Sequence, residues 1–219
     1  MELTSEDFQL FERDLFAFQQ LKERYSNEAI EEIKQGYKEH WQKWKTLQQT
    51  VAQALLEDYR MDKPKIESWT NGWNLRSHFW SAYRDPMQLN QNACLAVLLN
   101  KKQFQVYLMF QHYKSEERNG SLAEYNGLLD KLQDWSKAVD IKDYYIWPQV
   151  EHELTDHLPL TEFLADPSQP EKLRLAMEGR SFQLGKLFFN TTSIPNVAEA
   201  TVQAMKELAP LYFMLNQPN

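Results

Sequence analysis

The sequence has little cysteine and little glycine, and each shortage excludes a class of protein. Its 219 residues include one cysteine, Cys94, and six glycines. A single cysteine cannot form an internal disulfide, and it lacks the partners that a zinc ribbon or a CxxC redox site needs. None of the glycines has the GxGxxG or GxxxxGK spacing that cradles nucleotide phosphates. We therefore predict neither a Rossmann nor a P-loop site, and no cofactor.

Long apolar runs are also missing. No stretch approaches the roughly 20 apolar residues that a membrane-spanning helix requires. The first residues, MELTSEDFQLFERD, are acidic where a secretory signal is basic, and no apolar segment follows them. Together with the single cysteine, these features lead us to expect a soluble cytoplasmic protein without membrane contact.

The charge is negative overall but unevenly distributed. The net charge of −7 argues against general affinity for phosphate backbones. Residues 63–118, however, carry a net +4, between a net −5 before them and a net −6 after them. The middle of the chain is therefore a basic island, where an anionic partner has the best chance of binding.

The N-terminal quarter has helical periodicity. Apolar residues recur every three or four positions from Phe8 to Leu21, after a capping signal at Thr4 and Asp7. A break at 25–27 precedes a second helical pattern that continues to about Tyr59. Lys63-Pro64 then ends it. We expect an antiparallel helical hairpin over residues 1–62.

The pattern changes to strand periodicity from about Ile66 to Phe189. QFQVYLMF (103–110) alternates between two faces, and the apolar NACLAVLLN precedes it across a short turn at 100–102, which predicts a hairpin. Further strands are expected at 143–147, ended by Pro148, and at 180–190, where Gly185 indicates a bulge or a close backbone contact. Helices are expected at 121–139 and at 197–215, with Pro210 kinking or ending the last one.

This order of elements predicts an α+β fold. We expect a single domain over residues 1–219, in which the N-terminal helical hairpin (1–62) packs with an antiparallel sheet and further helices, ending in a C-terminal helix (63–219). The sequence does not determine the order of the strands.

The segment SWTNGWNLRSHFWSAYRDP (68–86) is the strongest candidate site, because basic and aromatic residues alternate in it. As a strand, it places Arg76, His78, Trp80 and Arg84 on one face, and a helix would gather much the same groups. The neighbouring strand adds Tyr107 and Gln111, so the predicted ligand-binding set is Trp73, Arg76, His78, Trp80, Arg84, Tyr107 and Gln111. The alternative is that the tryptophans fill the junction between hairpin and sheet while the arginines pair with acidic residues.

EHELTDH (151–157) is the best candidate for metal binding. His152 and Asp156, or Glu153 and His157, stand four residues apart and would share a helix face, but the two histidines are five apart and would not. A solvated loop or helix start explains the same residues, and we assign no metal site.

Three hypotheses of function follow. The first is a non-catalytic cytoplasmic binding or regulatory protein that engages a protein partner or a small anionic ligand near residues 69–84 and 103–113. The second is a module that recognises nucleic acid through an exposed base, with binding that weakens steeply as salt rises. The third is a metal-dependent hydrolase using Glu151, His152, Asp156 and His157.

Overall fold

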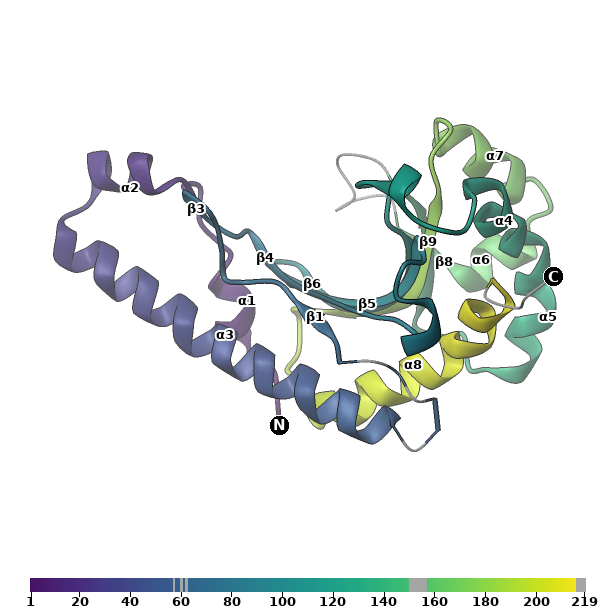
Figure 1. The fold of residues 1–219 in the computed structure, drawn as a ribbon, viewed down its shortest axis with the longest axis horizontal. Helices are drawn as coiled ribbons and strands as arrows, with labels where there is room; N and C mark the ends of the chain where they lie inside the picture. The colour runs from purple at the N-terminus through teal and green to yellow at the C-terminus, as the bar shows by residue number, and fades with distance from the viewer. Residues whose placement is uncertain (57, 60, 62, 150–156, 216–219) are drawn as a thin grey trace.

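The computed structural model describes residues 1–56, 58–59, 61, 63–149 and 157–215. It has the predicted α+β fold (Figure 1). The helices are α1 (Ser5–Gln9), α2 (Phe18–Arg24), α3 (Asn27–Leu55), α4 (Leu122–Asn126), α5 (Leu132–Trp135), α6 (Leu160–Ala165), α7 (Gln169–Ala176) and α8 (Val197–Met214). None of these helices is long and apolar enough to cross a lipid bilayer.

The core of the fold is a seven-stranded sheet in which every pairing is antiparallel. Its order is β1-β4-β5-β6-β9-β7-β8. The strands are β1 (Lys65–Ile66), β4 (His78–Tyr83), β5 (Ala93–Asn100), β6 (Gln103–Phe110), β7 (Tyr144–Pro148), β8 (Leu158–Pro159) and β9 (Phe182–Phe189), and β2 (Thr70–Asn71) with β3 (Asn74–Leu75) forms a separate small hairpin. The hairpin predicted at 100–102 joins β5 to β6, which confirms that expectation.

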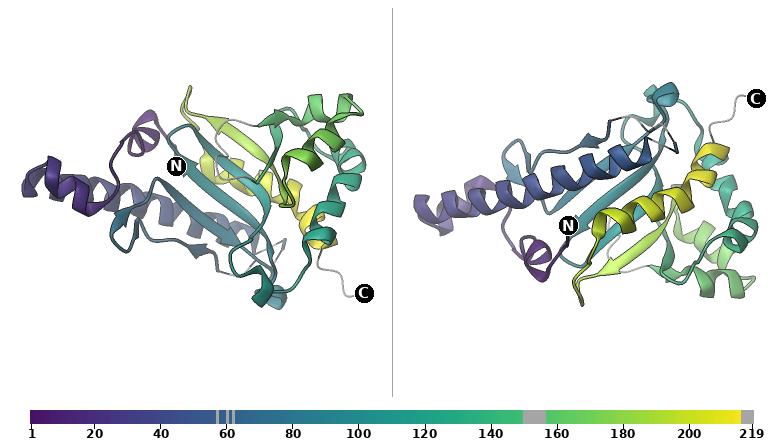
Figure 2. Two further views of the ribbon diagram at one scale, coloured as in Figure 1. Left: turned by 90° about the horizontal axis from the view of Figure 1, so that it is seen from above. Right: turned by 90° about the horizontal axis from the view of Figure 1, so that it is seen from below.

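The two faces of the sheet have different coverings. The long helices α3 and α8 lie side by side against one face, as the view from below in Figure 2 shows. In the view from above, the strands lie in front of both helices. Strand alternation therefore assigns one set of side chains to a helix-covered core and the other set to an uncovered face.

The covered face holds the main core, and β6 shows why. Phe104, Val106, Leu108 and Phe110 all point toward the helices and are buried in one apolar cluster. Trp44 of α3 packs on Phe104, with ring centroids 6.3 Å apart. The predicted alternation of 103–110 is thus confirmed. Every second residue of the strand is apolar, and these residues share the face that the helices cover.

The N-terminal arm differs from the predicted hairpin in its first half. A single helix was expected from Phe8 to Leu21, but the structure has two short helices, α1 and α2, with residues 10–17 between them. Residues 10–17 instead run against the sheet, where Phe11 packs on Phe79 at 5.0 Å and the Leu75 N–H donates to the Phe16 carbonyl. Contacts with the sheet outweigh the weak helical preference of this short segment.

Asp7 fixes α1 on α3. Its carboxylate, 2% exposed, accepts hydrogen bonds from His40 Nδ1 at 2.9 Å and Lys43 Nζ at 2.6 Å. Burial by itself would raise the pKa of Asp7, but these partners and the Thr4 N–H lower it to about 2. The residue expected only as a helix cap is therefore also an inter-helix anchor.

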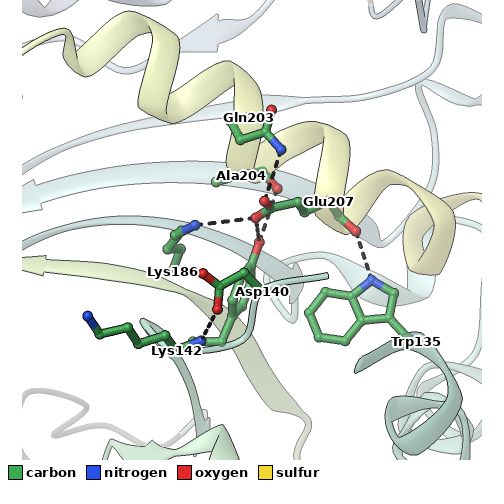
Figure 3. A network of polar contacts seen from close by, with 8 residues as sticks. Trp135, Asp140, Lys142, Lys186, Gln203, Ala204 and Glu207 are labelled. Carbon is green, nitrogen blue, oxygen red and sulfur yellow. Dashed lines mark hydrogen bonds and ion pairs between the residues drawn. The ribbon is translucent and has the colours of Figure 1, made fainter. Parts of the chain in front are cut away.

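Pro210 lies inside α8 and does not end it, since the helix continues to Met214. A proline leaves the carbonyl four residues earlier, that of Lys206, without its helical N–H donor. Tyr59 Oη lies 3.5 Å from that carbonyl, and the Trp135 indole N–H donates to the next one, of Glu207, at 2.8 Å (Figure 3). The Tyr59 hydroxyl thus stands in for the donor that Pro210 removes, and Trp135 binds the neighbouring carbonyl.

Glu207 also joins α8 to the sheet through its side chain. Its carboxylate accepts a hydrogen bond from Tyr144 Oη at 2.7 Å and lies 3.5 Å from Lys186 Nζ (Figure 3). Burial, with the nearby Glu207 carboxylate, raises the pKa of Tyr144 far above its usual value. This network lies on the covered face. It fixes helix α8 to the sheet and uses no side chain of the other face.

The region 121–139 is helical but irregular. The single predicted helix is divided into α4, the 3-10 segment η3 (Gly127–Lys131), α5 and the 3-10 segment η4 (Ser136–Ala138). Two further 3-10 turns are η1 (Pro86–Gln88) and η2 (Ser115–Glu117). Tyr125, Leu129, Leu132 and Trp135 are buried as the apolar spacing predicted.

Gly185 is the point of closest approach between two central strands. A Cβ at this position would overlap the Cα and Cβ of Tyr107 and the carbonyl oxygen of Val106. The expected close backbone contact is therefore confirmed, and only glycine permits it here. The sheet curves strongly around this region in Figure 1, so that its uncovered face is concave.

Candidate functional site

A cavity of about 510 Å³ lies on the uncovered, concave face of the sheet. Strands β4, β5 and β6 form its floor, and the segment 11–16 forms one wall. Its volume is within the range of sites that hold small molecules. The described residues that line it are Phe11, Arg13, Phe16, Ser77, His78, Leu98, Asn100, Lys101, Gln103, Gln105, His112, Gln149, His157 and Arg180.

The floor of the cavity is polar where the covered face is apolar. Gln103 donates from its amide nitrogen to Gln105 Oε1 at 2.8 Å, and the same nitrogen lies 3.2 Å from His157 Nε2. The His157 ring packs on Trp147 at 4.6 Å between centroids. This arrangement fixes the side chains, so that the floor offers a preformed set of amide and imidazole groups.

A second polar group lies at the other end of the cavity. Ser181 donates to Gln149 Oε1 at 2.7 Å, and His112 Nε2 lies 3.0 Å from Ser181 Oγ. Because the single hydroxyl proton goes to Gln149, His112 Nε2 is the donor in the second bond. In this arrangement the Ser181 hydroxyl joins the Gln149 amide to the His112 ring, and the three side chains fix one another's positions.

The charged groups of the cavity are all cationic. Arg13, Lys101 and Arg180 line it, and no carboxylate does so among the described residues. None of the three forms an ion pair with any described residue, although Arg13 lies over the Tyr37 ring at 5.8 Å. In a chain with seven more acidic than basic residues, such a set of cations without carboxylate partners is unusual.

Two histidines of the cavity, His78 and His112, are held in the neutral form. Burial, aided by the charge of Arg76, lowers the pKa of His78 to about 4. Burial and the charge of Arg180 also lower the pKa of His112. At neutral pH these rings therefore supply hydrogen bonds and flat surfaces, and the positive charge comes from the arginines and the lysine.

The predicted site residues are divided between three places. His78 lines the cavity, and Trp80 and Tyr107 are buried in the sheet face below it, where Trp80 Nε1 donates to Tyr107 Oη at 3.1 Å. Arg84 donates to Gln111 Oε1 at 2.7 Å and to the Gln91 carbonyl at 3.0 Å. Neither Arg84 nor Gln111 is among the described residues lining the cavity.

Arg76 and Trp73 lie outside the main cavity. Arg76 pairs with Glu67 at 2.7 Å and donates to the Ser68 carbonyl at 3.0 Å, which agrees with the structural alternative for the arginines. It lines a second cavity of about 340 Å³, which shares Phe16, Ser77 and His78 with the first. Trp73 is 87% exposed at the small hairpin, beside the Gly72 turn with its φ of +58°. Trp69 packs on Tyr37 of α3, as a residue of the junction.

Most of the predicted metal ligands, Glu151, His152, Glu153 and Asp156, lie outside the described residues. His157 is described, and its contacts are with Gln103 and Trp147. Within the described parts of the chain, no three histidine, cysteine, aspartate or glutamate side chains are grouped as metal ligands would be.

Sequence reasoning missed the three cations of the cavity. Arg13 is in the N-terminal arm, Lys101 is in the β5–β6 turn, and Arg180 precedes β9, so no local pattern connects them. One available signal was the pair Gln103 and Gln105, which occupies alternate positions of a strand whose other face is fully apolar. Two amides on that strand indicated a face that is not ordinary core.

Comparison with other proteins places the whole fold in one family. A family model without a functional description matches residues 3–215. The chain belongs to this family. An uncharacterized protein of Haemophilus influenzae (strain ATCC 51907 / DSM 11121 / KW20 / Rd) is 35% identical over 156 residues, which cover 71% of this chain and 72% of the relative. The family match spans both the helical arm and the sheet, and therefore every described residue of the cavity.

Proposed function

We propose that this family member is a non-catalytic binding protein that holds a small anionic ligand in the concave cavity. The observation that carries the proposal is the set Arg13, Lys101 and Arg180, which faces one cavity without a carboxylate partner among the described residues. Guanidinium and ammonium groups bind phosphate and carboxylate through charge-assisted hydrogen bonds. The neutral amides of the floor would orient the rest of the ligand.

Calorimetric titration with inorganic phosphate, citrate and adenosine monophosphate tests this proposal. We expect binding of at least one anion at low salt, and a loss of about tenfold in affinity for Arg180→Gln or Lys101→Gln. Arg24→Gln, an exposed arginine on α2 that does not line the cavity, is the matched control and should bind like the natural protein. Equal affinity in all variants, or no binding of any anion, would rule the cavity out as an anion site.

Recognition of nucleic acid is the second candidate, because the two cavities share a wall. Phe16, Ser77 and His78 line both, so the two cavities adjoin, and together they offer more length than one small molecule needs. Bases stack on aromatic side chains while cations contact the backbone. A fluorescent single-stranded oligonucleotide should then bind with an affinity that falls steeply with salt, and weak salt-independent binding would contradict this candidate.

The proposed function fits a cytoplasmic location. Cys94 is a buried free cysteine near the start of β5, and burial raises the pKa of its thiol. Fractionation of cells producing the tagged chain would test the location: recovery outside the cytoplasmic fraction would contradict it.

A further inference from the structure

We propose that the ligand is an elongated molecule with an anionic group at each end, and that the two ends bind at opposite ends of β6. This inference rests on the proposed anion-binding function and adds the geometry of the ligand. The cations of the cavity form two separate groups, one around Lys101 and one around Arg180. A single compact anion could contact only one of them.

The first group consists of Arg13 and Lys101. Phe11, two residues before Arg13, packs on Phe79 at 5.0 Å between ring centroids. Phe79 pairs across the sheet with Leu99, which is two residues before Lys101. The N-terminal arm and the β5–β6 turn therefore meet at one end of the sheet, at the start of β6.

The second group consists of Arg180 and the neighbouring hydrogen-bond donor His112. Arg180 directly precedes Ser181, whose hydroxyl lies 3.0 Å from His112 Nε2. His112 follows the end of β6, and Ser181 precedes the start of β9. Because β6 and β9 are antiparallel, these two positions come together at the end of the sheet opposite to Lys101.

The distance between the two groups of cations follows from the length of β6. Eight residues from Gln103 to Phe110 span about 23 Å along the strand at about 3.3 Å per residue. Curvature of the sheet brings the ends closer in a straight line (Figure 1). Two anionic groups on the order of 15–20 Å apart would therefore reach both groups of cations.

The floor between the two ends determines what connects the anions. Gln103 and Gln105 provide neutral donors and acceptors on the floor, Leu98 provides apolar surface beside them, and Phe16 adds apolar surface from the wall. These groups suit an uncharged organic spacer with both apolar and hydrogen-bonding parts. A third charge in the middle of the ligand would have no cation opposite it among the described lining residues.

A length series of alkane-α,ω-bisphosphates, with the matching alkyl monophosphates as controls, tests the inference by calorimetry. We expect affinity to rise with spacer length, by about tenfold or more over the monophosphates, until both ends are reached, and then to stop rising. The same series of α,ω-dicarboxylates distinguishes phosphate from carboxylate as the end group. Tighter binding of either series supports the two-ended ligand.

Variants locate the two ends. Arg180→Gln should bring the affinity of the best bisphosphate down to that of a monophosphate, and the double variant Arg13→Gln/Lys101→Gln should do the same. Arg24→Gln should leave the length dependence unchanged. If monophosphates bind but bisphosphates of every length bind no tighter, the two-ended ligand is overturned while the anion site stands. If no member of either series, phosphate or carboxylate, binds at any length, the proposed function fails with it.

Discussion

The two faces of the same sheet make opposite use of alternate residues. On β6, Phe104, Val106 and Leu108 point to helices α3 and α8, while Gln103, Gln105 and Tyr107 point to the concave side. The covered face buries apolar surface away from water, and this burial is the main source of stability. The open face has a much smaller apolar cluster around Trp80 and Trp147, surrounded by amides, histidines and cations. The comparison teaches that the apolar core and the polar cavity lie on opposite sides of one layer.

The largest expected effect comes from truncating the covered face. Phe104→Ala removes a fully buried ring that packs on Trp44 and Phe188, and should lower the free energy of unfolding by about 3–5 kcal/mol. Gln105→Ala, the next residue on the open face, should cost clearly less. Urea denaturation of both variants measures the difference. Equal losses would mean that the two faces stabilise the sheet alike.

The junction between β6 and β9 is the next test. Gly185→Ala places a methyl group on the backbone of Val106 and Tyr107, and should cost about 3 kcal/mol because neither backbone can move aside easily. Thermal unfolding checks the value. A neutral effect would show that the strands can separate here, and that the close approach does not set the concave shape.

The acid dependence of stability tests the burial of His78. The unfolded chain binds a proton near pH 6.5, whereas the folded ring has a pKa of about 4. Stability due to the neutral ring is therefore complete above about pH 6.5 and is lost as pH falls through about 4, by about 3 kcal/mol in all. His78→Gln should remove much of this slope in urea titrations between these pH values. An unchanged slope would assign it to other groups.

A glycine in an open position provides the contrast to Gly185. A Cβ on Gly36, in the middle of α3, would meet no atom within 4 Å. Gly36→Ala should stabilise the protein by about 0.5–1 kcal/mol, because alanine loses less backbone entropy in a helix. Destabilisation in the same denaturation assay would contradict the open space that the structure shows around Gly36.

The smallest effect is expected from the cations of the open face. Arg180→Gln should change the free energy of unfolding by less than about 0.5 kcal/mol, since Arg180 has no carboxylate partner among the described residues. The same variant should lose anion affinity, so a calorimetric titration and a urea curve on one sample separate the two roles. A large loss of stability would place Arg180 in the structural framework.

Local periodicity predicted the elements well where one face is apolar. The strand 103–110, its hairpin with 93–100 and the close contact at Gly185 all followed from residues near each other in the sequence. The path of residues 10–17 did not follow from the local pattern. Contacts of Phe11 with Phe79 of the sheet and of Phe16 with Leu75 of the small hairpin decided it. Pro210 was expected to kink or end the last helix; it does not end it, because the helix continues to Met214 and the Tyr59 hydroxyl contacts the carbonyl that loses its helical donor.

The predicted ligand-binding set includes residues of β4 and β6, which form part of the cavity floor, but of that set only His78 lines the cavity. Arg76 and Arg84 were chosen because they stand close to tryptophans in the chain, and the structure pairs them with Glu67 and Gln111. His78 lines the cavity, and Trp80 and Tyr107 lie beneath it. The partners of a charged side chain lie elsewhere in the sequence, so proximity to aromatic residues does not show whether an arginine is available for a ligand.

The sequence by itself determined the α+β class, the hairpin and the two alternating faces of β6, because these depend on periodicity over a few residues. Only the tertiary structure decided which face the helices cover, and it brought Arg13, Lys101 and Arg180 to one cavity. The physical reason is that burial and pairing are set by contacts between distant segments. A short pattern gives the direction of a side chain from its own strand, but the fold decides what that side chain meets.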